Sequence, residues 1–355
     1  MTFSIIIPLY QAEKTVRDCL ESLLPALGPK DEILLIDDGS HDRTEAVCQS
    51  YINKEPQIRY FYQENRGPSV ARNFGFSQAG GDLIIFLDAD DIVETLPFTK
   101  ALELARTSPV EIDIFVSDFY RASRTGCIYD RVFQIKETKE PIYDHLYMEI
   151  FLQQKECYWN VWRYIFRRKF LLENGLHFPE GCHCAEDLFF VTSAFLKTQR
   201  YAFFHLPYYH YIINDGETLT RKNTLSRISQ LMDMLCETEK RLDESDQFPY
   251  QQVIQRKLSL EFLTNLPLYW EIRRDERLEA KDIFTRNMWI LARSDVALHR
   301  GVALLAKVFG VPATAFFLLQ AKRLRRKRRE RQYRSYERLH VGQSLKGGAH
   351  PPKCL

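Results

Sequence analysis

The order of strand-like and helix-like segments in the first 91 residues constrains the fold of this chain most. Short apolar runs that suit buried strands alternate with segments whose apolar residues recur at helical spacing. The strand-like runs cover residues 3–10, 32–40, 58–63 and 82–91, and the helical patterns cover 13–27, 41–52 and 67–79. Strands that are separated by helices of this length form βαβ units. The sequence therefore predicts an α/β fold with a mostly parallel central sheet flanked by helices.

The rhythm changes after about residue 110. We predict a fifth strand at 112–120, an edge strand at 126–135, a mainly helical region at 145–200 and an extended segment at 201–213. Helical periodicity follows at 223–242, 249–270 and 278–293. The predicted organisation is an α/β domain at 1–220 with halves of about 1–110 and 111–220, a helical region at 221–295, and an apolar helix with a basic tail at 296–355.

The C-terminal end differs from the rest of the chain in charge. Residues 322–355 hold twelve Lys or Arg and two Asp or Glu, whereas residues 1–321 carry more acidic than basic side chains. The preceding segment, 296–321, is mostly apolar. Three interpretations compete for it: a buried core helix, an interfacial helix beside a polybasic patch on an anionic leaflet, and a transmembrane span. Nucleic-acid binding is not expected, because the acidic body offers no basic groove.

Cysteine usage and the N-terminus bear on the compartment. Eight cysteines are scattered, and Cys182-His183-Cys184 is the one tight group. No second pair at zinc-ligand spacing accompanies it, so buried hydrophobic thiols are the favoured interpretation over a metal site. The first ten residues lack the basic segment of a signal peptide. We therefore expect a cytoplasmic protein in a reducing compartment.

Two acidic motifs follow two of the predicted strands. Asp88, Asp90 and Asp91 end the run "LIIFLDADD", and Asp37 and Asp38 end "EILLIDD". Ligands bind at the carboxyl ends of strands in open α/β sheets, so we expect both motifs and Pro8–Tyr10 to converge on one edge. A D-x-D motif suits a Mg²⁺ or Mn²⁺ ion that also binds substrate phosphates. The alternative is that these carboxylates cap the helices that follow, and this is the role we predict for Asp91.

Three quoted segments together give a resemblance to a known family. "SIIIPLYQAEKTVRDCLESLL", "EILLIDDGSHDRT" and "NRGPSVARNFGFSQAGGDLIIFLDADD" resemble the N-terminal half of family 2 glycosyltransferases with the GT-A fold, of the type that builds bacterial surface polysaccharides. The resemblance continues more loosely through 160–190 and 208–221. Residues 222–355 match no part of that family pattern. Gln11 stands where the family usually has Asn.

The resemblance implies roles for particular residues. Asp187 would be the general base, with Glu186 beside it as a second catalytic candidate. Asp90 would bind Mn²⁺ or Mg²⁺, Asp88 would lie at the ribose or sugar, and Asp38 would accept a base imide N–H. The remaining residues implied in nucleotide-sugar binding are Pro8, Leu9, Tyr10, Glu13, Arg72 and Ala89. From the residues alone, Glu186 and Asp187 are equally an acidic first helical turn stabilised by the helix dipole.

The resemblance also implies a reaction. A carboxylate takes the proton from an acceptor hydroxyl as its oxygen attacks the anomeric carbon of a nucleotide-sugar, with inversion. The expected partners are a nucleotide-sugar donor, most simply a UDP-sugar, a saccharide or lipid-linked acceptor, and an anionic membrane surface on the inner face of the cytoplasmic membrane. The alternatives are a non-catalytic nucleotide-sugar-binding scaffold and a phosphatase of the haloacid dehalogenase type, which also uses D-x-D after a strand.

Overall fold

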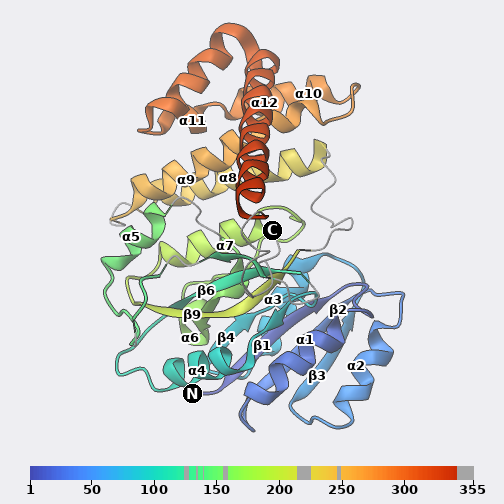
Figure 1. Ribbon diagram of the computed structural model, residues 1–355. Helices are drawn as coiled ribbons and strands as arrows, with labels where there is room; N and C mark the ends of the chain where they lie inside the picture. Colours follow the sequence, from blue (N-terminus) through green and yellow to red (C-terminus); the bar gives the residue numbers. More distant parts are fainter. Residues whose placement is uncertain are drawn as a thin grey trace. The chain divides into compact units, whose positions relative to one another are not determined.

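The computed structural model describes residues 1–123, 128–132, 135–138, 140–154, 159–213, 225–245 and 249–341 (Figure 1). The chain divides into two compact units. The first consists of Met1–Thr218 with Lys240–Val253, and the second consists of Leu219–Glu239 with Ile254–Leu355. The resemblance expected at 208–221 therefore falls partly outside the described residues, as does part of the edge strand expected at 126–135.

Within the described residues of the first unit, nine strands form one mixed sheet. The strands are β1 Phe3–Leu9, β2 Glu32–Asp38, β3 Ile58–Gln63, β4 Leu83–Phe86, β5 Ile92–Val93, β6 Ile114–Ala122, β7 Ile128–Val132, β8 Tyr164–Arg167 and β9 Tyr201–Ile212. Their order is β3-β2-β1-β4-β8-β6-β9-β5, and β7 pairs with β6. The first four strands are mutually parallel, and β9 is parallel to β6. The predicted mostly parallel α/β sheet is confirmed.

Strand β8 corrects the prediction that residues 145–200 are mainly helical. It is antiparallel to both β4 and β6 and joins the two halves of the sheet. Tyr164, Ile165 and Phe166 are all buried, so the strand shows no alternation of polar and apolar residues. A buried run this short gives no periodicity that separates a strand from a helix. Its neighbours in the sheet decide its conformation.

Helices cover both faces of the sheet (Figure 1). They are α1 Val16–Leu23, α2 Thr44–Ile52, α3 Pro68–Gln78, α4 Thr95–Arg106, α5 Tyr147–Gln153, α6 Arg168–Glu173 and α7 Glu186–Phe195. Ile5 of β1 joins the core cluster that contains Leu20 of α1 and Phe98 of α4. Ile6 points to the opposite face, where a Cβ on Gly75 of α3 would lie 2.4 Å from its Cγ2. Helix α3 therefore lies so close to the sheet that no residue larger than glycine fits at position 75.

The described part of the chain beyond residue 225 is helical. It contains α8 Leu225–Asp243, α9 Gln251–Asn265, α10 Arg277–Asn287, α11 Trp289–Arg293 and α12 Ala297–Val341, with a 3₁₀ turn at Leu266–Trp270. Ala297–Leu324 is long and apolar enough to cross a membrane, and 33% of its most apolar window is buried. Gly310 has φ 80° and ψ 160°, which breaks α12 into two arms.

The break at Gly310 bears on the three interpretations of this segment. A spanning helix needs about 20 consecutive apolar residues. The apolar part of each arm is shorter than that, because the first ends before Gly310 and the second meets Lys322 and Arg323. Figure 1 shows the chain changing direction between the arms. This geometry disfavours one continuous span and leaves a packed or an interfacial helix pair.

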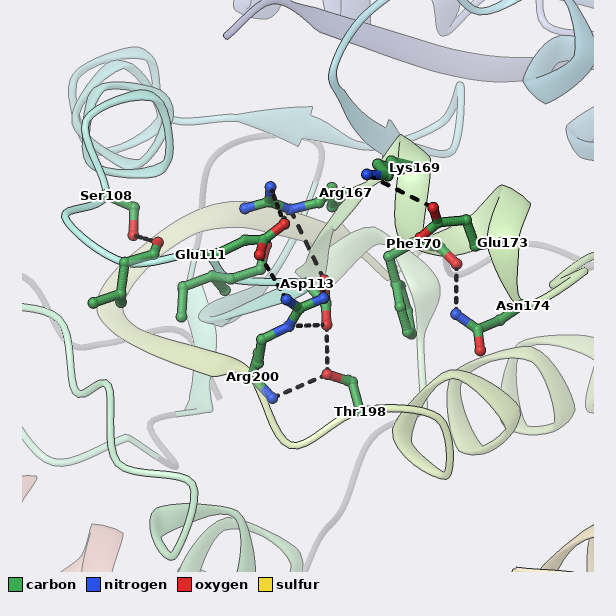
Figure 2. A network of polar contacts seen from close by, with 12 residues as sticks. Ser108, Glu111, Asp113, Arg167, Lys169, Phe170, Glu173, Asn174, Thr198 and Arg200 are labelled. Atoms are coloured by element: carbon green, nitrogen blue, oxygen red, sulfur yellow. Dashed lines mark hydrogen bonds and ion pairs between the residues drawn. The ribbon is translucent and has the colours of Figure 1, made fainter.

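A polar network links the strand ends of the sheet at the start of β6 (Figure 2). Asp113 is 1% exposed and accepts hydrogen bonds from Nε and Nη2 of Arg200 at 2.7 and 2.8 Å and from Thr198. Glu111 accepts from Arg167 and Arg200, at 2.9 and 2.7 Å. The network ties the strand starts of β6 and β9 to the end of β8. It lies at the edge opposite the carboxyl ends of β1, β2 and β4.

Removing the buried acceptor of this network should destabilise the first unit. We expect Asp113→Ala to lower the free energy of unfolding by about 2 kcal/mol, below the usual cost of breaking a buried pair because Arg200 is half-exposed. Glu111→Gln is the matched control, since Glu111 is 53% exposed and should cost less than about 1 kcal/mol. Urea unfolding measures both. Equal effects of the two substitutions would contradict the conclusion that Asp113 is the main acceptor of this network.

Candidate active site

The carboxyl ends of three parallel strands bring the predicted site segments together. Leu9 at the end of β1 is in register with Asp37 of β2, and Ile6 is in register with Phe86 at the end of β4. The backbone N–H of Gln11, which has φ 53°, donates to Ser40 Oγ at 3.0 Å. The prediction that Pro8–Tyr10, the Asp37 region and the Asp88 region converge on one edge is confirmed.

The pair at the end of β2 organises backbone around it. Asp38 is 4% exposed, and its carboxylate accepts from Gln63 Nε2 at 2.7 Å and from the N–H groups of Arg66 and Gly67 at 2.9 and 2.8 Å. Asp37 accepts from Tyr60 Oη and from the Ser40 N–H. Asp38 therefore fixes the turn that opens α3. Its contact with a nucleotide base stays a prediction.

The expectation that Asp37 or Asp38 caps the next helix is wrong. Helix α2 begins at Thr44, and Asp42 accepts from the Thr44 N–H at 3.0 Å. The first two carboxylates stand too early in the chain and are used for contacts across the sheet. A local pattern of acidic residues before a helix does not show which of them will reach its first turn.

The three carboxylates after β4 have three different environments. Asp90 is exposed, Asp88 is half-buried, and Asp91 is 2% exposed. Asp91 accepts hydrogen bonds from Tyr209 Oη and the Ile212 N–H, both at 2.6 Å. Burial, followed by the charges of Asp90 and Asp88, raises the pKa of Asp91 well above its ordinary value. Asp91 thus ties the acidic loop to β9.

The prediction that Asp91 caps a helix is wrong. Helix α4 begins at Thr95, with Glu94 before it. Trp162 supports the partner of Asp91 instead, because its ring stacks on Tyr209 with centroids 4.1 Å apart and planes 9° apart. No sequence pattern pairs residue 91 with residue 209, so this support was not foreseen.

Arg72 lies at the centre of the site. Its side chain is 5% exposed. Nη2 lies 2.8 Å from Asp88 Oδ1, and Nη1 lies 3.3 Å from Glu186 Oε1 and 3.4 Å from Asp187 Oδ1. These charges raise the pKa of Arg72 against the opposing effect of burial. The guanidinium joins the end of β4 to the start of α7. Its predicted contact with donor phosphate remains a prediction, and the contacts it makes here are with carboxylates.

Asp187 has the environment of a base that works near neutral pH. It stands in the first turn of α7, after Ala185 in the left-handed conformation with φ 62°. Its Oδ2 accepts from the Val161 N–H at 3.0 Å. Burial raises the pKa of Asp187 to about 7, opposed by Arg72 and assisted by the charges of Glu186 and Asp88. A carboxylate with such a pKa is suited to general base catalysis.

The remaining predicted residues differ in what they offer a ligand. Tyr10 is 43% exposed, whereas Leu9 is fully buried and so offers a ligand no exposed surface. Glu13 accepts from the Arg43 N–H at 3.1 Å and is half-buried. Pro8 is half-buried and Ala89 is 8% exposed. Binding of a nucleotide-sugar by these residues stays a prediction.

The Cys182-His183-Cys184 segment packs on the start of α3. A Cβ on Gly67, which has φ 89°, would lie 2.3 Å from His183 Cε1. The Cys182 carbonyl accepts from Ser69 Oγ at 3.3 Å. Within the residues that the structure describes, no group of three or more His, Cys, Asp or Glu side chains is arranged to hold a metal ion. The segment therefore packs against the turn that Asp38 organises.

The acidic loop fits a cation only together with a substrate. Asp90 offers an exposed carboxylate at a strand end, among like charges that a divalent ion would offset. Mg²⁺ and Mn²⁺ take oxygen ligands and are held by one or two carboxylates with phosphates and water. The donor set here matches that arrangement rather than a cage made by protein alone.

Comparisons with known proteins agree with this fold. Residues 4–184 match the family described as "Glycosyl transferase family 2". The match covers half of the chain. The chain belongs to glycosyl transferase family 2.

Individual relatives point to the same family. The chain is 34% identical over 204 residues to the uncharacterized glycosyltransferase EpsJ of Bacillus subtilis, covering 56% of this chain and 57% of EpsJ. It is 30% identical over 224 residues to the uncharacterized glycosyltransferase YibD of Escherichia coli, covering 60% and 61%. The chain thus spans about three fifths of the length of these curated relatives.

A solved structure of similar fold covers more of the chain. The S. aureus TarS fragment 1–349, crystallised in complex with UDP-GlcNAc, superposes with a TM-score of 0.71 over 91% of this chain and 92% of that fragment, at 20% identity. This likeness concerns the fold. It confirms the GT-A architecture that the resemblance implied and the C-terminal helical region that the helical periodicity predicted.

Loss of Arg72 should make stability depend on pH. Arg72 holds the pKa of Asp187 down against burial and against the charges of Glu186 and Asp88, so its loss raises the folded-state pKa of Asp187 further. The resulting destabilisation is full above that folded-state pKa and disappears as pH falls below the unfolded-state pKa of the same group. We expect Arg72→Gln to cost about 3 kcal/mol near neutral pH and less under acidic conditions, measured by urea unfolding.

The matched control for this prediction is Arg66→Gln. Arg66 lies six residues earlier, before α3 begins, and its side chain is 62% exposed beside an exposed Glu180. Its loss should cost less than about 1 kcal/mol at every pH. A destabilisation by Arg72→Gln that is the same at acidic and neutral pH would show that the arginine does not hold the carboxylates together.

Proposed function

We propose that this protein is an inverting glycosyltransferase that uses a UDP-sugar donor. The observation that carries the proposal is the single guanidinium of Arg72, which joins Asp88 beside the donor edge of the sheet to Asp187, whose pKa lies at about 7. One side of the site thus holds a carboxylate for the donor, and the other holds a base for the acceptor.

Asp187 has the properties that the proton transfer requires. Its ionised carboxylate takes the proton from an acceptor hydroxyl while that oxygen attacks the anomeric carbon and the bond to the diphosphate breaks. The carboxylate is held in one orientation, because Arg72 donates to its Oδ1 and the Val161 N–H donates to its Oδ2. Glu186, 16% exposed and also paired with Arg72, shapes the field around the base.

The donor is assigned to the carboxyl ends of β1, β2 and β4. The exposed ring of Tyr10 offers a surface for the base, and Asp88 lies where the sugar side of the donor would come. Asp90 is assigned to a Mg²⁺ or Mn²⁺ ion, which when bound stabilises the charge of the leaving diphosphate. Arg72 keeps Asp88 in place through the ion pair at 2.8 Å.

The acceptor is proposed to be a growing cell-surface polymer or its lipid-linked precursor. TarS of Staphylococcus aureus, described as a poly(ribitol-phosphate) beta-N-acetylglucosaminyltransferase, is 29% identical over 226 residues, covering 62% of this chain and 37% of TarS. The B. subtilis relative described as the minor teichoic acid biosynthesis protein GgaB is 28% identical over 224 residues. These relatives support a surface-polymer role for the chain.

Family membership decides against one alternative and leaves another to experiment. A haloacid dehalogenase phosphatase is not compatible with membership of glycosyl transferase family 2. A non-catalytic scaffold would keep the fold and lose turnover. Nucleotide release from a panel of UDP-sugars and other nucleotide-sugars with Mn²⁺ separates these possibilities. The proposal is supported if Asp90→Ala abolishes nucleotide release and Glu111→Gln preserves it. No nucleotide release with any donor would favour the scaffold.

The base gives a pH signature. Because Asp187 acts in its ionised form, we expect the transfer rate to be low below pH 7, to rise through about 7 and then to level off. Asp187→Asn should lower kcat about 100-fold or more and remove this rise. The pH dependence of kcat tests both statements. An Asp187→Asn enzyme that keeps the rate and profile of the wild type would assign the base elsewhere.

We also propose that the protein lies on the inner face of the cytoplasmic membrane. The apolar arms of α12 lead directly into a basic stretch in which Lys322, Arg323 and Lys327 are exposed. Basic residues beside an apolar surface attract an anionic leaflet with about 1 kcal/mol each. The two features are adjacent in one helix, as an interfacial anchor requires.

Neutralising this basic stretch should weaken membrane association. Lys322→Gln, Arg323→Gln and Lys327→Gln together should lower partition onto phosphatidylglycerol-containing vesicles by about 100-fold at low salt. The control removes three exposed lysines elsewhere, by Lys54→Gln, Lys100→Gln and Lys281→Gln. Vesicle co-sedimentation measures both variants. Equal losses would mean that net charge, and not this segment, drives association.

A further inference from the structure

A cavity of about 470 Å³ lies in the second unit. It is bounded on one side by Met288, Trp289 and Ala292 around α11, and on the other by the first arm of α12. Ala303 and Leu304 belong to that arm. The volume falls in the range of small-molecule sites, which are mostly apolar with a few polar groups. No residue discussed in the candidate active site lines it.

Small side chains at the helix contact create the cavity. Ala292, Ala303 and Ala306 line it, and the last two are 8% and 7% exposed. Alanine at these positions leaves space that a leucine-sized residue would fill. The ring of Trp289, 37% exposed, forms part of the wall. The space is thus built from the packing of well-defined helices and not from a loop.

Two cations stand on the same face of α12 as the apolar lining. Arg300 and Lys307 both line the cavity, both are exposed, and they are seven residues apart, which places them two turns apart on one side of the helix. Among the lining residues that the structure describes, none is Asp or Glu. The site therefore combines an apolar interior with positive charge, which suits an amphiphile with an anionic headgroup.

The surface beside the cavity is of the kind that meets a membrane. Large apolar side chains on either side of the break at Gly310 are exposed: Leu305 48%, Val308 64%, Phe309 63%, Phe316 46% and Phe317 66%. We call these five residues the apolar apex. Leu304, 62% exposed, connects the apex to the cavity wall. The exposed basic residues at the start of the tail complement an anionic leaflet.

We propose that the cavity takes one acyl chain of an anionic membrane phospholipid, whose phosphate is bound by Arg300 and Lys307. The proposal rests on the membrane association proposed above. A free phosphate alone would leave the apolar walls of the cavity unoccupied. The two cations favour an anionic over a zwitterionic headgroup. A lipid held in this way would fix the second unit at a defined depth, which diffuse attraction to the basic tail does not do.

Trp289 provides a direct reporter of occupancy. Phospholipids brominated on the acyl chain quench a tryptophan that they contact, and the difference between wild type and Trp289→Phe isolates its signal. We expect vesicles of brominated phosphatidylglycerol to quench this difference signal and vesicles of brominated phosphatidylcholine to quench it much less. Short-chain brominated phosphatidylglycerol, used as a monomer, should give the same preference without a bilayer.

A filled cavity should abolish the signal. Ala303→Phe places a ring in the space, and Gly301→Phe is the matched control, because a Cβ at position 301 meets nothing within 4 Å. We expect Ala303→Phe to lose quenching by the monomeric lipid and Gly301→Phe to keep it. Thermal unfolding of both variants establishes that each is folded. Quenching that persists in a folded Ala303→Phe variant would overturn the proposal.

The charge requirement has its own test. Arg300→Gln with Lys307→Gln should lower affinity for monomeric phosphatidylglycerol about tenfold and lower affinity for phosphatidylcholine less. Equal affinity of the wild type for both lipids would contradict a headgroup site. Vesicle co-sedimentation and nucleotide release are measured in parallel. If the protein binds monomeric lipid but does not co-sediment with vesicles, membrane association is rejected and the lipid site in the cavity is not. If it binds monomeric lipid but releases no nucleotide, transferase activity is rejected and the lipid site is not.

Discussion

The ion pairs of Arg72 are the interaction on which the candidate site depends. One buried guanidinium contacts Asp88 at the end of β4 and both Glu186 and Asp187 at the start of α7. These carboxylates would repel one another if they were brought together alone. Because breaking a buried pair leaves charge uncompensated, the arginine makes the proximity of the three carboxylates stable. It acts as a positioning residue in this structure.

The same electrostatic problem explains the other contacts around the acidic loop. Asp91 carries the cost of burial beside two carboxylates, and Tyr209 and Ile212 each donate a hydrogen bond to it. This contact holds the loop to β9 and leaves Asp90 exposed. The loop is therefore rigid on one side and open on the other. Such a division is what a site needs if a metal and a diphosphate are to bind at its exposed carboxylate.

The proposed chemistry and the proposed membrane attachment belong to different units of the chain. The candidate active site is built on the carboxyl ends of parallel strands in the first unit, whereas the apolar apex and the basic residues belong to α12 in the second. The break at Gly310 turns a stretch that looks like a membrane span into two arms with exposed apolar side chains. An enzyme acting on surface polymers would use such a device to remain at the leaflet where lipid-linked acceptors are found.

The sequence by itself determined the βαβ order of the first 91 residues and the convergence of its acidic motifs, because both follow from local periodicity and from the geometry of parallel strands. It also located Asp187 through resemblance. Only the tertiary structure decided that Tyr164–Arg167 is a strand, that Asp91 binds Tyr209, and that Arg72 contacts three carboxylates. These outcomes join residues far apart in the chain. No local pattern encodes them, since burial and charge balance arise only once the whole sheet is assembled.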